Sequence, residues 1–171
     1  HVLGENSVES ISSQLTVTST PKPQRLKSHA DRCFIGHYPM GDGFIVDDDI
    51  VQELLCDVRN TEIVFPYITG QDVNTSPSQK ASRWIINFGE KTEQEARQFA
   101  KCYRIIEEHV KPDRIKAKRK ANRERWWRYA ETRPGLCKAL SEGNDVFVQP
   151  FVSKYINPVK VDSHQVFASP M

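Results

Sequence analysis

Residues 83–110 read RWIINFGEKTEQEARQFAKCYRIIEEHV and pass from a strand pattern to a helix pattern across one short turn. The apolar run at residues 83–88 predicts a buried strand. Thr92 and Glu95 stand three residues apart, as in the capping box of a helix N-terminus. Beyond this box, apolar residues recur at helical spacing and predict one amphipathic helix, whose buried stripe contains Phe99, Tyr103, Ile106 and Val110.

Shorter elements are expected on both sides of this stretch. Together they predict an α+β fold with short mixed or antiparallel strands, a central amphipathic helix and a basic helix. Pro66 requires an edge strand or a bend in the run EIVFPYI at residues 62–68. The unit GDG at residues 41–43 is typical of a hairpin turn. The other expected elements are extended pieces at Cys33–Gly36 and Phe44–Val46, helices at about Asp48–Asp57 and Leu136–Leu140, and extended runs at Val146–Val152 and Val159–Ala168.

Length and composition indicate one domain behind an N-terminal segment. A chain of 171 residues with 38% hydrophobic and 27% charged residues can form a soluble domain with a core. Residues 1–30 are rich in Ser, Thr and Pro and are expected to be partly extended, with a short strand at Val8–Ser12. Residues 31–171 then form the domain. The first residue is His rather than Met, which indicates a fragment of a longer protein.

The sequence shows no membrane or secretion signal. No run approaches eighteen apolar residues, and no basic-then-apolar segment opens the chain, so we expect a cytoplasmic protein without membrane contact. Cys33, Cys56, Cys102 and Cys137 form no CxxC pair, which fits a reducing compartment. Cys56 and Cys102 lie within apolar patterns and are expected to be buried free thiols.

The charge of the chain is concentrated in one segment. Residues 111–128, KPDRIKAKRKANRERWWR, hold nine basic residues and two acids, a net charge of +7 in a chain whose total is +2. Pro112 is expected to end or kink the preceding helix, or to begin a new one, and strong helix formers follow it. A basic helix here can bind a polyanion, because each Lys or Arg on a phosphate backbone releases condensed counterions. A solvated surface helix is the alternative.

No catalytic motif is recognisable. GxSxG and HExxH are absent, and the string NPVK at residues 157–160 lacks the second proline and the aromatic residue of an amino-methyltransferase loop. The triplet DDD at residues 47–49 is interpreted as a helix cap rather than a metal site. Trp126 and Trp127 could stack on a base, but we expect at least one in the core, since burying an indole stabilises by roughly 2–3 kcal/mol. These features favour a binding module.

An ordered series of phrases gives a more specific signal. Between about Val8 and about Phe167 the chain contains, in order, ISSQL, RCFIGHYPMGDGFIV, ELL, VFPYITGQDVN, PSQKASRWIINFG, EAR, VKPDR, RERWWRYAETRPGL and FVSK. This series resembles the target-recognition region of large single-chain DNA adenine-N6 methyltransferases. The family includes MmeI-like type II restriction-modification enzymes and related bacteriophage-defence methyltransferases.

The resemblance implies a sequence-specific double-stranded DNA recognition module that is not catalytic by itself. It implies a partner in the methyltransferase domain of the same chain, N-terminal to this region. That domain would hold the S-adenosylmethionine site and the Asn-Pro-Pro-aromatic loop, so no cofactor is expected here. The parent is then a site-specific DNA methyltransferase, and an additional endonuclease activity stays open. Because the family continues into further helices, the resemblance also implies a truncated C-terminal end.

Two sets of side chains are candidates for the DNA contacts. Phosphate contacts position a protein on DNA, and base contacts select the sequence. In VFVQPFVSKYINP, polar residues interrupt an apolar strand pattern, and Gln can bond adenine while Lys can bond guanine in the major groove. A solvent-facing strand position is the alternative for Gln149. The candidates for phosphate contact are Lys111, Arg114, Lys118, Arg119, Arg123 and Arg125, and those for base reading are Gln149, Ser153, Lys154 and Tyr155.

A protein-interaction or scaffold domain is the second functional hypothesis. Its basic helix would dock an acidic partner. Residues 42–62 hold seven carboxylates and one arginine, and this stretch could itself be the partner, within the fold or in a homo-oligomer. A free-standing enzyme is the third hypothesis.

Overall fold

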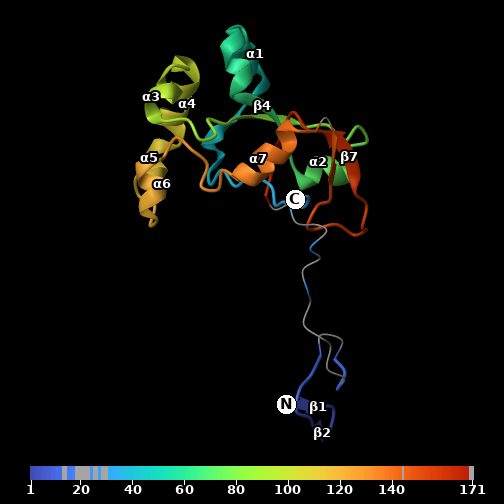
Figure 1. The fold of residues 1–171 in the computed structure, drawn as a ribbon. Helices are drawn as coiled ribbons and strands as arrows, with labels where there is room; N and C mark the ends of the chain where they lie inside the picture. The colour runs from blue at the N-terminus through green and yellow to red at the C-terminus, as the bar shows by residue number, and fades with distance from the viewer. Residues whose placement is uncertain (13–14, 18–23, 25–26, 28–30, 144, 170–171) are drawn as a thin grey trace. The chain divides into compact units, whose positions relative to one another are not determined.

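The computed structural model describes residues 1–12, 15–17, 24, 27, 31–143 and 145–169. The chain divides into two compact units, His1–Ala30 and Asp31–Met171 (Figure 1). The larger unit combines helices with mixed sheets, so the predicted α+β class is confirmed.

The described part of the N-terminal unit contains a small hairpin. Its strands β1 (Val2–Leu3) and β2 (Asn6–Ser7) pair antiparallel. The strand predicted at Val8–Ser12 is wrong, because these residues form no ladder. The backbone of Ser12 is used in a turn instead, since its carbonyl accepts a hydrogen bond from the Leu15 N–H at 2.9 Å.

A four-stranded sheet forms the centre of the larger unit. Its strands are β3 (Ile45–Val46), β4 (Val64–Ile68), β5 (Arg83–Ile86) and β8 (Val166–Phe167), in the order β3-β5-β4-β8. β5 pairs antiparallel with β3 and β4, whereas β8 runs parallel to β4. The strand predicted from RWIINF is therefore an inner strand, and its two isoleucines are fully buried.

Pro66 lies in an inner strand at a point where only one neighbour pairs. β8 pairs with β4 at Tyr67 and Ile68, beyond the proline. A proline has no N–H for a second ladder, and the short β8 satisfies this constraint. The predicted edge position thus holds for Pro66 itself, although β4 as a whole has neighbours on both sides.

Short helices connect the strands of this sheet (Figure 1). Helix α1 (Asp48–Leu55) has Asp47 at its N-cap position and two aspartates in its first turn, although no side-chain hydrogen bond caps it. The negative charges lie at the positive end of the helix dipole. The other short helices are η2 (Asp42–Phe44), η3 (Val58–Glu62), α2 (Gly70–Thr75) and α7 (Pro134–Ser141), and α7 includes the helix predicted at Leu136–Leu140.

The capping box at Thr92 is confirmed. The Thr92 N–H donates to the Glu95 carboxylate at 2.6 Å, and the Thr92 hydroxyl accepts from the Glu95 N–H at 3.3 Å. The single helix predicted after it is in fact two, α3 (Glu93–Arg97) and α4 (Ala100–His109), because the chain leaves helical geometry at Phe99, where ψ is 64°. The apolar stripe survives this break, with Tyr103, Ile106 and Val110 buried and Phe99 half-buried.

The segment before β3 differs from the prediction. Residues 33–36 form no strand, and β3 pairs with β5, so Gly41-Asp42-Gly43 is not a hairpin turn. Gly43 instead packs against the C-terminal end of α4, where an added Cβ atom would lie 2.6 Å from the His109 carbonyl oxygen. The glycine permits a close approach of two backbones.

The C-terminal extended runs are shorter than predicted. β6 (Asp145–Val148) pairs antiparallel with β7 (Val159–Asp162) in a separate two-stranded sheet. The run predicted at Val146–Val152 therefore ends at Val148, and the run at Val159–Ala168 consists of β7 followed by β8. Residues 149–158 form a loop between β6 and β7. Prolines at positions 150 and 158 explain the interruption, since neither can donate to the ladder.

Two cysteine predictions have opposite outcomes. Cys102 is buried on α4, and burial raises the pKa of its thiol to about 12. Cys56 is exposed, because α1 ends one residue before it. Its thiol donates to the Gln52 carbonyl at 3.3 Å. The apolar residues that precede Cys56 form the buried face of α1, and Cys56 lies beyond the last residue of that helix.

His37 is a buried titratable side chain next to β8. The backbone N–H of His37 donates to the Phe167 carbonyl at 2.7 Å, and the backbone carbonyl of His37 accepts from the Ser169 N–H at 2.8 Å. The ring is 2% exposed, with Nε2 3.4 Å from the Cys137 sulfur. Desolvation lowers the pKa of His37 from 6.5 to about 4, because the charged ring has lost its water.

Acid should destabilise the fold through His37. The unfolded ring takes up a proton near pH 6.5, and the folded ring does so only near pH 4, so stability falls as pH drops through this window. We expect a loss of roughly 3 kcal/mol in the free energy of unfolding, measured by urea denaturation at pH 7 and pH 4. His37→Asn should flatten this dependence, and the exposed control His164→Asn should not. Equal slopes in wild type and His37→Asn would contradict the assignment.

Candidate nucleic-acid interface

The basic segment, residues 111–128, folds as two short helices rather than the single basic helix predicted. Helix α5 (Lys111–Arg114) follows α4 directly and has Pro112 in its first turn, which is one of the predicted roles of this proline. Helix α6 (Lys120–Glu124) begins after a turn. The Arg123 guanidinium donates to the carbonyls of Ala117 and Lys118 at 2.7 and 2.9 Å, so one basic side chain closes that turn.

Arg114 lies inside the molecule. Its side chain is 1% exposed, and its Nη2 donates to the carbonyls of Pro39 and Arg128, the latter at 3.0 Å. The guanidinium carbon lies 5.7 Å from the centre of the Phe44 ring. Two neutral carbonyls and an aromatic ring therefore replace the water around this cation.

The prediction that Arg114 contacts phosphate is wrong for this structure. A phosphate cannot reach a guanidinium that is covered by protein on all sides. No carboxylate among the described residues forms an ion pair with Arg114, and its Nε and Nη1 make no hydrogen bond there. Burial without a counter-charge lowers the pKa of Arg114 below its usual value. The side chain joins the segment to the core instead of presenting charge.

Three tryptophan and tyrosine side chains anchor the C-terminal end of the basic segment. Trp126 and Trp127 are each 6% exposed, so both belong to the core and neither is available to stack on a base. The Trp127 indole N–H donates to the Lys91 carbonyl at 3.0 Å, and the Tyr129 hydroxyl donates to the Ile86 carbonyl at 3.0 Å. The polar atoms of Trp127 and Tyr129 are thus satisfied inside the fold.

Several other cations of the segment are engaged with neighbours. Lys111 pairs with Glu107 at 2.7 Å and lies over the Trp126 ring. Arg119 pairs with Glu131 at 3.2 Å, although its side chain remains 71% exposed. An exposed ion pair is worth about 0–1 kcal/mol, so a phosphate can replace the carboxylate of such a pair at little cost.

An exposed basic surface remains, formed by residues 116–125. This surface has six basic residues and one acid, Glu124. Lys116, Lys118 and Arg125 are exposed and form no ion pair with any residue that the structure describes. Of the predicted phosphate contacts, Lys118, Arg119, Arg123 and Arg125 are exposed within this ten-residue stretch. Lys116, which was not predicted as a contact, also lies in it.

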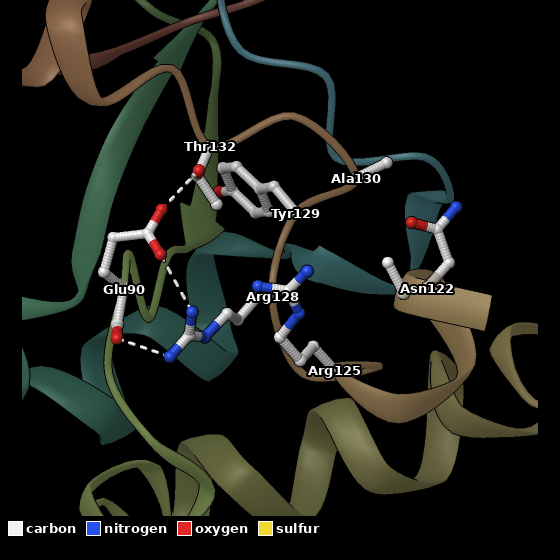
Figure 2. A pocket seen from close by; sticks show the side chains of 8 residues that line it. Glu90, Asn122, Arg125, Arg128, Tyr129, Ala130 and Thr132 are labelled. Atoms are coloured by element: carbon white, nitrogen blue, oxygen red, sulfur yellow. Dashed lines mark hydrogen bonds and ion pairs between the residues drawn. The ribbon is translucent and has the colours of Figure 1, made fainter. Parts of the chain in front are cut away.

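A hollow of about 100 Å³ lies at the edge of this surface (Figure 2). Arg128 forms its wall and is held by Glu90, whose carboxylate accepts from Arg128 Nη1 at 2.8 Å and from the Thr132 hydroxyl. The Arg125 guanidinium lines the hollow and makes no hydrogen bond to a described residue. The lining residues are Glu90, Ala121, Asn122, Arg125, Arg128, Tyr129, Ala130 and Thr132. Two guanidinium groups beside one carboxylate give this hollow a net positive charge.

The residues predicted to read bases lie on the loop between β6 and β7. Gln149 is not placed for that role, because its Oε1 accepts from the Asn157 N–H at 2.8 Å and its Nε2 donates to the Pro150 carbonyl at 3.2 Å. The Ser153 hydroxyl donates to the Tyr155 carbonyl at 2.8 Å. Both polar side chains are thus used to hold the loop together.

Lys154 and Tyr155 remain exposed on this loop, with the Lys154 amine 5.1 Å from the centre of the Tyr155 ring. The loop and helix α6 lie at opposite sides of the larger unit (Figure 1). The structure therefore does not bring the predicted base readers next to the exposed basic surface. The exposed apolar side chains of the same loop were not singled out from the sequence, because residues 146–152 were predicted as one extended run.

Comparisons of the chain with protein-family models, with curated proteins and with solved structures found no match. Among the described residues, no helix has the length and apolar character needed to cross a membrane.

A pair of arginine substitutions should separate the buried cation from the exposed ones. Arg114→Ala leaves two carbonyls unpaired and a cavity beside Phe44, and we expect the free energy of unfolding to fall by roughly 2–4 kcal/mol. Arg125→Ala removes an unpaired exposed charge and should change it by less than about 0.5 kcal/mol. Denaturant unfolding of both variants checks this. Equal stability of the two would show that Arg114 does not hold the segment in place.

Proposed function

We propose that this chain is a double-stranded DNA recognition module of a DNA adenine-N6 methyltransferase or restriction-modification enzyme, without catalytic activity of its own. The observation that carries the proposal is the exposed basic surface at residues 116–125, with six cations and one acid. Phosphates of a DNA backbone are the ligand that such a surface fits, since binding releases condensed counterions.

The arrangement of the cations supports a rigid phosphate-binding surface. Arg114 and the two buried tryptophans fix the ends of the basic segment on the core. The exposed side chains between them are carried on a turn and on helix α6. A fixed backbone lowers the conformational entropy that binding must remove.

The methyltransferase context rests on the order of phrases in the sequence. On this proposal, S-adenosylmethionine binds to a catalytic domain of the parent chain, and the module supplies the DNA contacts. Lys154 and Tyr155 keep their proposed role at the bases, since both are exposed. Gln149 and Ser153 take the supporting role of holding the loop.

Among the residues that the structure describes, the contact between His37 and Cys137 resembles a nucleophile and its base, but the pKa shifts of both groups oppose that role. His37 Nε2 lies 3.4 Å from the Cys137 sulfur. A nucleophilic cysteine needs a lowered pKa, whereas burial raises the pKa of Cys137, with Glu90 adding to the effect. Burial also keeps His37 neutral. Neither pKa is thus shifted toward the charged form that a nucleophile and its base require, although Cys137 itself is exposed and only His37 is buried.

Docking to an acidic protein surface is the second candidate function. Asp48 and Asp49 on α1 are exposed and form no ion pair with the described residues. They provide an acidic surface that a second copy of the chain could bring against residues 116–125. A molecular mass that doubles at low salt, measured by light scattering, would favour this function over DNA binding by a monomer.

DNA binding should depend strongly on salt and on the exposed basic surface. With about four to five phosphate contacts, log K should fall with log salt at a slope near −4 in fluorescence anisotropy with a duplex. The double variant Lys118→Glu, Arg119→Glu should weaken binding to all sequences alike and reduce the slope by about 2.

A matched control keeps the change in net charge the same. Lys80→Glu with Lys138→Glu reverses two exposed charges outside the basic segment and should leave affinity within about threefold of wild type, because distant exposed charges are screened. No binding at about 50 mM salt, or a loss as large in this control, would contradict the proposal.

A further inference from the structure

The loop between β6 and β7 exposes an unusual amount of apolar surface. Large apolar side chains in water are normally scattered singly, and a cluster of them marks a binding surface. Here four occur within six residues: Phe151, Val152, Tyr155 and Ile156 are 74%, 85%, 67% and 93% exposed. Packing within the chain does not account for apolar residues at these four positions, because most of each side chain is in contact with solvent.

The loop is nevertheless built to hold one conformation. The side chain of Gln149 spans its base by accepting from the Asn157 N–H at 2.8 Å. The Ser153 hydroxyl donates to the Tyr155 carbonyl at 2.8 Å and closes a tight turn at the tip. Asn74 on α2 donates to the Val152 carbonyl at 3.0 Å and ties the loop to the larger unit. The apolar side chains are thus presented outward by a pre-organised backbone.

A hollow of about 390 Å³ lies between this loop and α2, which run side by side in Figure 1. Its volume is in the range of about 300–1,000 Å³ that is usual for sites of small organic ligands. One part of its lining is aromatic or apolar, and the other part carries amide and hydroxyl groups. The lining residues are Val73, Asn74, Ser153, Tyr155, Ile156 and Asn157.

We propose that this hollow binds one unstacked nucleobase of the DNA. Tyr155 would stack on the face of the base, and the amide of Asn157 would bond its edge. Lys154, whose amine lies 5.1 Å from the centre of the Tyr155 ring, would contact the adjoining phosphate. Stacking on an aromatic ring together with hydrogen bonds to the base edge is how proteins hold bases outside a duplex. This inference rests on the proposed function, and it requires a duplex that runs across the larger unit from the exposed basic surface to this loop, since the two lie at opposite sides of the unit (Figure 1).

Charge and polarity favour a nucleotide over an apolar occupant. Lys154 is the one charged residue of the loop at residues 149–158, so the loop itself carries a net charge of +1, which favours an anion. Lys160 on β7 does not add to it, because it pairs with Asp145 at 2.7 Å. A groove for an apolar peptide or for lipid tails would desolvate the Asn157 amide without offering it a partner, whereas the Asn74 amide N–H is already bonded to the Val152 carbonyl. A base offers donors and acceptors at its edge and an apolar face, which matches both parts of the lining.

The test compares two duplexes that differ by one unpaired nucleotide. In the complete chain, wild type should bind a duplex with a single bulged nucleotide about tenfold more tightly than the fully paired duplex, measured by anisotropy at one salt concentration. Tyr155→Ala should lose this preference, and Tyr155→Phe should keep it, because the ring is retained. Tyr155 is exposed, and unchanged unfolding midpoints will show that both variants fold.

The outcomes separate this inference from the proposed function. Equal affinity of wild type for the two duplexes, or a preference that persists in Tyr155→Ala, would overturn the nucleobase site and leave duplex binding intact. Binding of wild type to neither duplex would overturn both. Loss of affinity for both duplexes in Lys118→Glu, Arg119→Glu with the bulge preference retained would support two separate contacts, one for phosphates and one for a base.

Discussion

The position of the basic segment depends on the buried guanidinium of Arg114. A buried charge is costly unless neighbouring groups replace its water. Here the carbonyls of Pro39 and Arg128 and the ring of Phe44 do so, and no described carboxylate takes part. The bonds join residues that are 75 and 14 positions from Arg114, so one side chain fixes the path of the whole segment. Of the nine cations in the segment, Arg114 therefore has a structural role, whereas the six at residues 116–125 remain exposed.

The buried and the exposed residues of the segment have different physical roles. At the ends of the segment, Arg114, Trp126 and Trp127 are buried and give the backbone a fixed course over the core. Between them, residues 116–125 carry their charges into solvent, where phosphates can replace weak ion pairs such as the one between Arg119 and Glu131. The loop between β6 and β7 adds an aromatic and amide-lined hollow at another part of the unit. On the proposed function, charge holds the duplex and the hollow takes a base.

Local signals in the sequence predicted the local structure well. The Thr92–Glu95 box, the strands β4 and β5 and helix α7 all occur where their patterns placed them, because capping and periodicity act within a few residues. The burial of Arg114 was not predictable in this way, since it depends on a carbonyl 75 positions away. Residues 149–152 were predicted as the end of an extended run at Val146–Val152, although Pro150 within it cannot donate to a ladder. The sequence therefore predicted which segment carries the positive charge, but not that Arg114 is buried or that Gln149 and Ser153 are bonded within their own loop.

The most direct test of this account is a map of the residues that respond to DNA. Amide chemical shifts of the ¹⁵N-labelled chain, recorded during titration with a short duplex, report contact residue by residue. The account predicts progressive shifts concentrated at residues 116–125, with Trp126 and Trp127 little affected. Shifts concentrated instead on the acidic helix α1, or no shifts at a salt concentration where anisotropy reports binding, would contradict the central claim that the exposed basic surface holds the DNA.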